Sequence, residues 1–148
     1  MRAVMQRVLR ARVTVDGAEV GAIGHGWAIL LGVGPGDDTA IADGLVEKMA
    51  TLRAFEDENG RMNLAADQVG GEILVISQFT LYADLKGRRP GFARAAPPAI
   101  AQPLVEHVAN RFRERGFRVA TGQFGAMMDV ELVNHGPVTI VMSTDGWT

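Results

Sequence analysis

The sequence predicts an α+β fold in which a largely antiparallel, barrel-like sheet packs with two main helices. Three observations support this class. Strand-like segments separated by tight turns fill the first third of the chain, two later segments carry apolar residues at helical spacing, and further strand-like segments close the chain. The length of 148 residues matches a domain of the commonest size, about 100–150 residues, so we expect a single domain over residues 1–148.

The N-terminal third is predicted to be an antiparallel meander. Asp16-Gly17 is a strong hairpin signal, because both central residues of a type I′ turn need a positive φ. A second turn at residues 24–26 leads into the most apolar segment of this region. The expected strands are residues 3–9, 12–15, 19–23 and 27–33.

Two amphipathic helices are predicted. Asp37 or Asp38 can cap the first helix, which ends near Arg53. The second helix covers about Ala99–Arg115 and is followed by Gly116, a typical residue just after a helix C-terminus. Each helix has one apolar face. These faces consist of Ile41, Leu45, Met49 and Leu52 in the first helix and Ile100, Leu104, Val108 and Phe112 in the second.

The remaining elements are strands and one irregular segment. Glu72–Tyr82 is the best candidate for a central strand, with an apolar run that precedes Ser77. The stretch Lys86–Pro98 is rich in Gly, Pro and Arg and is expected to be irregular. Three closing strands are predicted over residues 117–121, 127–133 and 138–142. Meander, helix, strand, helix and strands in this order make an α+β domain.

The composition is that of a globular protein without thiol chemistry. Hydrophobic residues make up 47% of the chain and charged residues 22%, which argues against disorder. The absence of cysteine excludes a disulfide scaffold, a Cys-ligated metal site and a thiol nucleophile. The apolar run Trp27–Val33 is far shorter than the roughly 20 residues of a membrane span. Residues 1–7 also lack the apolar region of a signal peptide, so we expect a cytoplasmic protein without a membrane partner.

The charge is unevenly distributed along the chain. The net charge is −2, but residues 2–12 and 86–118 together hold 12 of the 15 basic residues and only 2 of the 17 acidic ones. If these stretches meet in space, they form a basic face, which is typical of phosphate binding. The alternative is a solvated helix face with scattered arginines.

Ser77-Gln78-Phe79-Thr80-Leu81 places polar residues at the end of a buried strand, where polar groups are costly unless bonded. In a strand, Gln78 and Thr80 face one side and the residues between them face the other. One interpretation is the edge of a pocket, with hydroxyl, amide and backbone N–H groups directed at a ligand. The other is a strand passing from core to surface, since no His–Asp pair is adjacent to activate a hydroxyl.

Two further features carry no site. The segment 32–36 resembles a phosphate loop only faintly, because it lacks the Lys-Ser/Thr of a P-loop and Pro35 removes an N–H, so we interpret it as a strand-to-helix turn. His25, His107 and His135 show no metal-ligand spacing, and we expect no metal site.

Two turns close to the C-terminus have both a functional and a plain interpretation. If the Gly136–Pro137 bond is cis, two successive carbonyls can form a rigid acceptor pair for an amine; a trans turn is the plain alternative. The glycines of residues 122–128 would let a flat ring approach the backbone, with Phe124 and Met128 as apolar walls. A loop with core anchors is the plain alternative there.

Other motifs extend along the whole chain. They are Met1-Arg2-Ala3-Val4, Gln6-Arg7-Val8, Phe55-Glu56-Asp57, Met62-Asn63, Lys86-Gly87, Arg89-Pro90 and Asn134…Gly136-Pro137-Val138-Thr139. Together with the segments 77–81 and 122–128, they make the chain resemble the D-aminoacyl-tRNA deacylase family, without a large insertion. Two residues depart from the family pattern: Gly91 stands where Ser is usual, and His135 stands where Asp is common.

The resemblance implies a homodimeric hydrolase without cofactor or metal that cleaves the ester between a D-amino acid and the 3′-terminal adenosine of tRNA. It implies that Gly136-Pro137 is cis, enters the active site of the other subunit and holds the α-amino group of the D-substrate through its carbonyls. The L-substrate is then excluded sterically. Glycine has no side chain to exclude, so glycyl-tRNA is expected to be cleaved as well.

The resemblance also assigns roles to side chains. It places Ser77, Gln78, Phe79 and Thr80 around the scissile ester, and we expect the N–H groups of Phe79 and Thr80 to stabilise the oxyanion and Gln78 to orient the ribose. A Thr80 nucleophile is the rival mechanism. Arg7 is expected to brace the Gly–Pro loop. The adenine site is expected at Phe124, Gly125, Ala126 and Met128, and the tRNA phosphate contacts at Lys86, Arg88 and Arg89.

Two other classes of function stay open on the residues alone. One is a non-catalytic tRNA- or nucleotide-binding module that uses the same basic residues and adenine pocket. The other is a small-molecule esterase without an RNA substrate.

Overall fold

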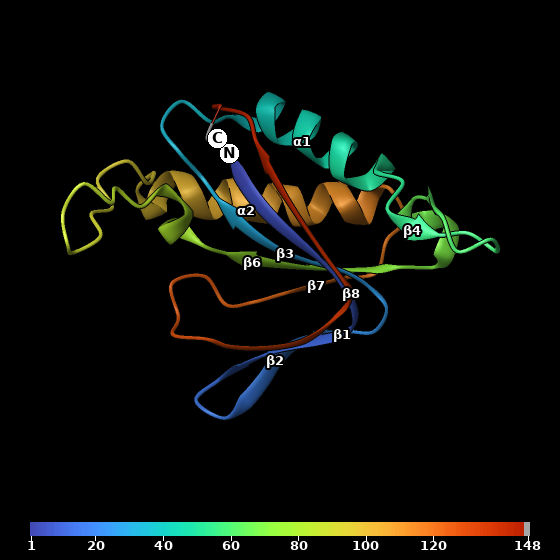
Figure 1. The fold of residues 1–148 in the computed structure, drawn as a ribbon. Helices are drawn as coiled ribbons and strands as arrows, with labels where there is room; N and C mark the ends of the chain where they lie inside the picture. Colours follow the sequence, from blue (N-terminus) through green and yellow to red (C-terminus); the bar gives the residue numbers. More distant parts are fainter. Residues whose placement is uncertain (147–148) are drawn as a thin grey trace.

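Two helices cover a mixed sheet in the computed structural model, which describes residues 1–146 (Figure 1). Residues 147 and 148 of the expected domain lie outside the described part. The strands are β1 (Arg2–Val15), β2 (Ala18–Ile23), β3 (Gly26–Gly32), β4 (Phe55–Glu56), β5 (Met62–Leu64), β6 (Glu72–Ser77), β7 (Val119–Thr121) and β8 (Asp129–Ser143). The helices are α1 (Thr39–Thr51) and α2 (Pro98–Glu114), with 3-10 turns η1 (Ala66–Val69) and η2 (Phe79–Tyr82).

The predicted fold class is confirmed, although the sheet is mixed rather than largely antiparallel. The strand order is β2-β1-β3-β6-β7, with β8 paired to β1, and the β3–β6 and β6–β7 pairs are parallel. The reason is the connections: α1 lies between β3 and β6, and α2 between β6 and β7, and such helical crossovers join parallel strands. Gly21 of β2 lies directly against Thr121 of β7, so the sheet is nearly closed.

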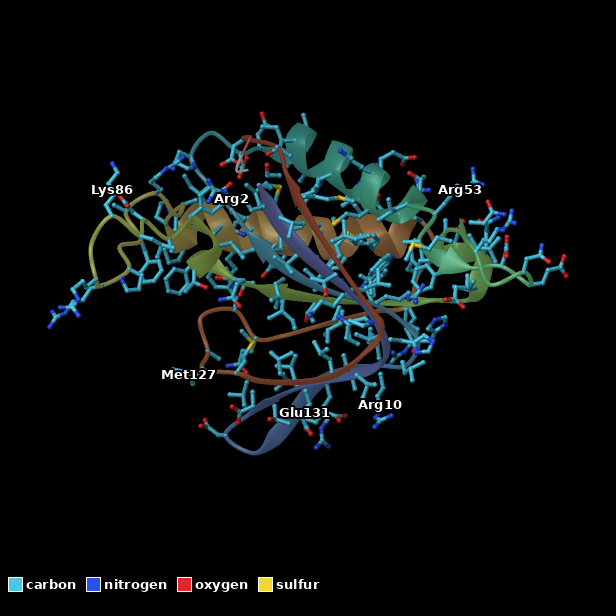
Figure 2. All side chains as sticks on the ribbon, viewed as in Figure 1. Arg2, Arg10, Arg53, Lys86, Met127 and Glu131 are labelled. Carbon is cyan, nitrogen blue, oxygen red and sulfur yellow. The ribbon has the colours of Figure 1, made fainter. Side chains whose placement is uncertain are left out.

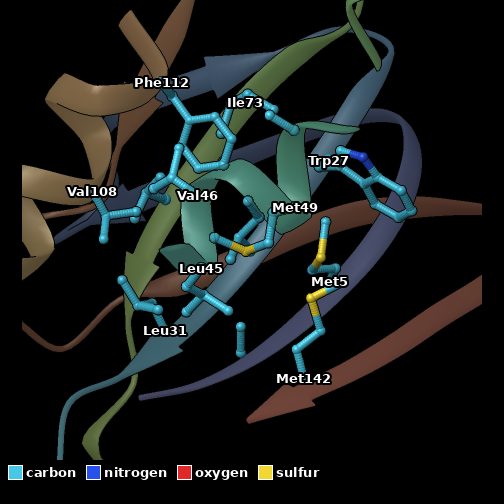
Figure 3. Close-up of a cluster of buried hydrophobic side chains, with 14 of the residues drawn as sticks. Met5, Trp27, Leu31, Leu45, Val46, Met49, Ile73, Val108, Phe112 and Met142 are labelled. Atoms are coloured by element: carbon cyan, nitrogen blue, oxygen red, sulfur yellow. The ribbon is translucent and has the colours of Figure 1, made fainter. Parts of the chain in front are cut away.

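Two apolar clusters lie on the two faces of the central strands. Ile73 and Val75 of β6 face the helices, whereas Leu74 and Ile76 face the interior of the nearly closed sheet. Burial on both faces explains why these strands are continuous apolar runs rather than alternating ones. The cluster beneath the helices contains Met5, Trp27, Leu31, Leu45, Met49, Val108, Phe112 and Met142 among others (Figure 3).

Three predicted strand boundaries are wrong. The segments 3–9 and 12–15 form one strand, β1, and the last two predicted strands are both parts of β8, which continues through Gly136-Pro137. The predicted strand Glu72–Tyr82 ends at Ser77, where the chain turns into η2. The hairpin at Asp16-Gly17 is confirmed, with φ values of 50° and 78°.

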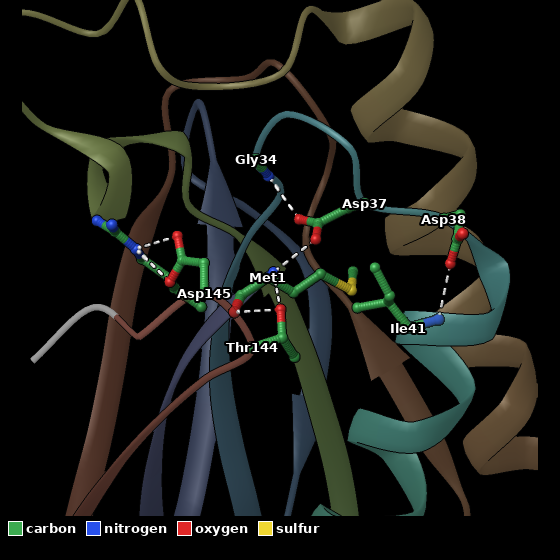
Figure 4. Close-up of polar contacts among 8 residues, drawn as sticks. Met1, Gly34, Asp37, Asp38, Ile41, Thr144 and Asp145 are labelled. Atoms are coloured by element: carbon green, nitrogen blue, oxygen red, sulfur yellow. Dashed lines mark hydrogen bonds and ion pairs between the residues drawn. The ribbon is translucent and has the colours of Figure 1, made fainter.

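The two predicted helices are confirmed, and the structure shows which of the two candidate aspartates caps α1. Asp38 caps α1 by accepting a hydrogen bond from the Ile41 N–H, at 2.8 Å, whereas Asp37 binds the Met1 amino group at 2.8 Å (Figure 4). In α2 the predicted apolar face holds except at Ile100, which is half exposed. No helix within residues 1–146 is long and apolar enough to cross a membrane.

A candidate active site and the Gly136–Pro137 loop

The polar segment after β6 forms the turn η2 instead of continuing the strand. The predicted strand conformation of Gln78 and Thr80 is therefore wrong, although their side chains do lie on one side, joined by a hydrogen bond. Two glycines of the β3–α1 turn make room for η2. A Cβ on Gly32 would lie 3.0 Å from the Gln78 carbonyl oxygen, and one on Gly34 would lie 2.4 Å from the ring of Tyr82. The segment 32–36 is the expected strand-to-helix turn, and it also supports η2.

Arg2 anchors η2 from the first strand. Its guanidinium donates to the Leu81 carbonyl at 2.8 Å, lies 4.2 Å from the centroid of the Tyr82 ring, and forms an ion pair with Asp145 at 3.2 Å. The side chain is buried, with only 6% of its surface exposed. Burial raises the pKa of the Tyr82 hydroxyl, and the charges of Asp37 and Asp145 add to this. The Tyr82 phenol is therefore neutral, and the cluster works as a fixed support.

A pocket of about 400 Å³ lies beside η2, between the ends of β3 and β6 and the start of α2. It brings together five of the predicted site residues: Ser77, Gln78, Phe79, Phe124 and Gly125. Thr80, Ala126 and Met128 are not among its lining residues. The sequence analysis missed its apolar walls, which are Leu31, Val33, Phe92, Ala95, Ala96, Pro97, Pro98, Ala101 and Val105.

Met128 takes part in the core rather than in the pocket. Its side chain packs with the second apolar cluster, and its sulfur lies 2.7 Å from where a Cβ on Gly122 would be. The plain interpretation of a core anchor therefore fits Met128. Among the four residues predicted for the adenine site, Phe124 both packs against the first cluster and borders the pocket.

The pocket edge offers a small set of polar groups. The N–H groups of Phe79 and Thr80 have no hydrogen-bond partner among the described residues, since η2 provides internal or adjoining bonds only from Leu81 onward. The Gln78 side-chain amide donates to the Thr80 hydroxyl, and Ser77 is half buried at the pocket wall. Two adjacent free N–H groups, a hydroxyl and an amide can bind an oxygen that gains negative charge.

The Gly136–Pro137 loop is an exposed bulge in β8. Its peptide bond is cis, and Gly136 has a φ of 138°. Gln6 of β1 pairs with Thr139 and Val8 with Asn134, so residues 135–138 stand opposite one residue of β1. That residue is Arg7.

Arg7 holds the base of this loop. Its Nε donates to the His135 carbonyl at 2.9 Å, and its Nη1 donates to the Ala54 carbonyl at 2.8 Å. The side chain of Arg7 is only 4% exposed. On the other side of the loop, the Asn134 side-chain oxygen accepts from the Val138 N–H at 2.7 Å. The expected bracing by Arg7 is confirmed.

Within one chain, the loop and the pocket lie apart. In the sheet, Ser77 of β6 pairs with Leu31 of β3, and Leu31 pairs with Ala3 of β1. The loop, in contrast, lies opposite Arg7 of β1. Four residues along β1 correspond to about 13 Å, and the three strand spacings from β6 through β3 and β1 to β8 add about 14 Å across the sheet. The Gly136–Pro137 loop therefore does not reach the pocket of its own chain.

Comparison with known proteins places this architecture. The family model described as "D-Tyr-tRNA(Tyr) deacylase" matches residues 4–143. The chain belongs to this family. A protein of Heliobacterium modesticaldum named D-aminoacyl-tRNA deacylase is 58% identical over 147 residues, which cover 99% of this chain and 98% of that one. A protein of Roseiflexus castenholzii with the same name is 60% identical over 145 residues, covering 97% of this chain and 92% of that one.

Two solved structures share the deacylase-family fold. One is titled "c-Myc DNA Unwinding Element Binding Protein"; it has a TM-score of 0.91 and 40% identity, covering 97% of this chain and 99% of that one. The other is titled as a probable eukaryotic D-amino acid tRNA deacylase, with a TM-score of 0.81 and 16% identity over 95% and 97% of the two chains. At that identity the second likeness shows the fold alone.

The basic residues of this deacylase-family chain do not combine into one basic face. In the first stretch Arg2 and Arg7 are buried, and Arg12 pairs with Glu131. In the second stretch, the arginines of and after α2 bond to nearby side chains, namely Arg111, Arg113, Arg115 and Arg118. The predicted phosphate contacts Lys86, Arg88 and Arg89 are exposed and form no ion pair with a described residue. The loop that carries them projects from one end of the molecule, and Arg53 lies at the other (Figure 2).

The histidines form no metal centre in the part of the chain that the structure describes. His107 lies 2.6 Å from Asp43 and links the two helices. His25 and His135 line a cavity of about 150 Å³ under the Gly–Pro loop, together with Arg7 and Glu56. Burial lowers the pKa of His25, and the charges of His135 and Arg7 lower it further.

Proposed function

We propose that this protein hydrolyses the ester between a D-amino acid and the 3′-terminal adenosine of tRNA. Family membership and relatives of 52–60% identity named D-aminoacyl-tRNA deacylase support this activity. The observation that carries the proposal is the polar edge of the pocket, where Ser77, Gln78 and Phe79 border an apolar cavity and the adjacent N–H groups of Phe79 and Thr80 have no partner among the described residues. Because aminoacyl-tRNA is consumed by translation, we place the protein in the cytoplasm, as one domain over residues 1–148.

The proposed chemistry uses water and the substrate's own hydroxyl. Water adds to the ester carbonyl carbon, and the carbonyl oxygen becomes an oxyanion bound by the N–H groups of Phe79 and Thr80. Gln78 orients the ribose, and the ribose 2′-OH positions the attacking water. The tetrahedral intermediate then breaks its bond to the ribose oxygen. That oxygen takes up the proton that water loses, so the products are the free D-amino acid and tRNA.

The adenosine is proposed to lie against the turn that follows β7. Phe124 and Gly125 line the pocket and supply an aromatic ring and an accessible backbone. Ala126 and Met128 belong to the same turn, with Met128 fixing it to the core. Lys86, Arg88 and Arg89 then meet the phosphates of the tRNA end.

Chirality is proposed to be read by the Gly136–Pro137 loop of a second copy in a homodimer. The loop is exposed, firmly held, and about 13 Å along the strands from its own pocket, so a partner's pocket is the one it can enter. Its carbonyls accept from the α-amino group, and an L side chain meets the loop backbone. Glycine has no side chain to meet it, so glycyl-tRNA is also a substrate.

A paired assay tests the proposal. Purified protein is incubated with D- and L-aminoacyl-tRNA of the same amino acid, and free amino acid is measured. We expect hydrolysis of the D-ester only, and loss of most of it in Gly136→Ala, because the added Cβ would lie 2.8 Å from a Val138 methyl and 3.1 Å from Arg7. Binding of tRNA without hydrolysis would favour a binding module, and hydrolysis of simple esters alone would favour a small-molecule esterase.

A further inference from the structure

A pair of aromatic rings, one exposed and one half-buried, lies at the pocket edge. Phe79 of η2 is 57% exposed, and its ring meets that of Phe92 edge to face with centroids 5.0 Å apart. Both rings line the pocket. The exposed part of the Phe79 ring is apolar surface at the pocket edge that a flat ligand ring can cover.

The segment that carries Phe92 separates two hollows. Phe92, Ala95 and Ala96 line the pocket, whereas Gly91, Ala93 and Arg94 line a second hollow of about 240 Å³. The two hollows therefore lie on the two sides of one wall, residues 91–96. The other lining residues of the second hollow are Asp84, Lys86, Gly87 and Arg89.

The second hollow is positively charged and its loop has a defined shape. Asp84 and Gly91 exchange backbone hydrogen bonds of 2.7 and 2.9 Å, which close the loop at its base. Three cations line the hollow against one carboxylate, and Lys86, Arg89 and Arg94 form no ion pair with a residue in the range 1–146. Such charge, beside aromatic rings, is typical of a groove for single-stranded nucleic acid.

We propose that Phe79 and Phe92 form a stacking platform for the second nucleobase from the 3′ end, in which the base lies on the face of one ring while the other ring, at an interplanar angle of 76°, holds that ring from its edge, and that Lys86, Arg89 and Arg94 bind the phosphates that follow it. The platform is sequence-tolerant, because every base has a π-face. This inference rests on the proposed function and deepens it. The substrate is then a single-stranded polynucleotide end of at least two nucleotides, not an aminoacyl-adenosine alone.

The test compares two substrates that carry the same D-amino acid: the aminoacylated tRNA and the 3′-ester of adenosine alone. For each we measure kcat/KM, and we follow the ratio of the two values. The wild type is expected to favour the tRNA by about 100-fold or more, since stacking and phosphate contacts act only there.

Variants show which residues cause the preference for the tRNA ester over the adenosine ester. Phe92→Leu keeps apolar volume but removes the ring, and it should lower the ratio about tenfold. The double variant Lys86→Gln/Arg94→Gln should lower the ratio about tenfold and flatten its dependence on salt. Lys48→Gln removes an exposed positive charge on α1 and serves as the matched control, with the ratio unchanged.

The outcomes separate this inference from the proposed function. Equal kcat/KM for both esters in the wild type, or an equal slowing of both by Phe92→Leu, would overturn the platform while leaving deacylation intact. If neither ester is hydrolysed, the proposed function fails. In that case the affinity for uncharged tRNA still tests the platform. The platform requires Phe92→Leu to bind uncharged tRNA about tenfold more weakly than the wild type, and equal affinity of the two proteins contradicts it.

Discussion

The Gly136–Pro137 loop and the pocket beside η2 differ in whether their backbone polar groups are hydrogen-bonded. At the loop, Arg7 and Asn134 occupy backbone groups on both sides of the bulge. At the pocket, two successive N–H groups are left without a described partner. A part that reads the shape of a substrate must be fixed beforehand, because any freedom would lower its discrimination. A part that acts on a bond must keep its donors open for the charge that develops.

Removing Arg7 gives the largest expected effect on the fixed region. Arg7→Gln leaves the carbonyls of Ala54 and His135 without their charged donor, and we expect a loss of about 3 kcal/mol in the free energy of unfolding. Urea unfolding measures it. Arg10→Gln on the same strand is the control, since its exposed side chain should change stability by only about 0.5 kcal/mol or less. Equal losses in both variants would show that Arg7 does not hold the loop.

A smaller effect is expected from a substitution in the turn at residues 32–36, which supports η2 beside the pocket. In Gly34→Ala the new methyl meets the ring of Tyr82, which is 1% exposed and has no room to move. We expect a loss of about 1–3 kcal/mol and a lower kcat, because η2 must shift.

Gly44→Ala provides the matched control for this substitution. Open space surrounds Gly44 on α1, so alanine there should raise stability by about 0.5–1 kcal/mol and leave kcat unchanged. Wild-type stability and kcat in Gly34→Ala would contradict the supporting role of the turn.

The smallest effect is expected from a substitution in η2, beside the pocket. Thr80→Ala removes the hydroxyl but keeps the backbone N–H, and we expect kcat/KM to stay within about tenfold of the wild type. Thermal unfolding checks that the variant is folded. A loss of about 1,000-fold or more, in a folded variant, would instead identify the Thr80 hydroxyl as a nucleophile.

Structural features that depend only on residues close together in the sequence were predicted correctly. The hairpin at Asp16-Gly17, the cap of α1 and the apolar faces of both helices depend on neighbouring residues, and they are confirmed apart from Ile100. The parallel strand pairs were not predicted, because they depend on where the helices carry the chain. The end of β6 at Ser77 was missed because polar and apolar residues alternate from Gln78 to Leu81, which is the pattern of a strand.

The candidate site was predicted only in part for a similar reason. Polar segments attract notice in a sequence, and Ser77, Gln78, Phe124 and Gly125 do meet at one pocket. Its walls are ordinary apolar residues of three elements, which no local signal sets apart. The arginines show the same limit, because charge alone does not reveal that Arg2 and Arg7 are buried supports. The isomer of the Gly–Pro bond was expected only through the family resemblance.

Mixing two inactive variants tests most directly whether the loop of one copy completes the pocket of another. Gly136→Ala disables the loop, and Ser77→Phe fills the pocket. Each is expected to be nearly inactive on D-aminoacyl-tRNA by itself. Co-expressed, they should regain about a quarter of the wild-type rate, because half of the dimers are hybrids with one intact site of two. No recovery, with hybrid dimers present, would show that loop and pocket do not act across two copies and would contradict the account.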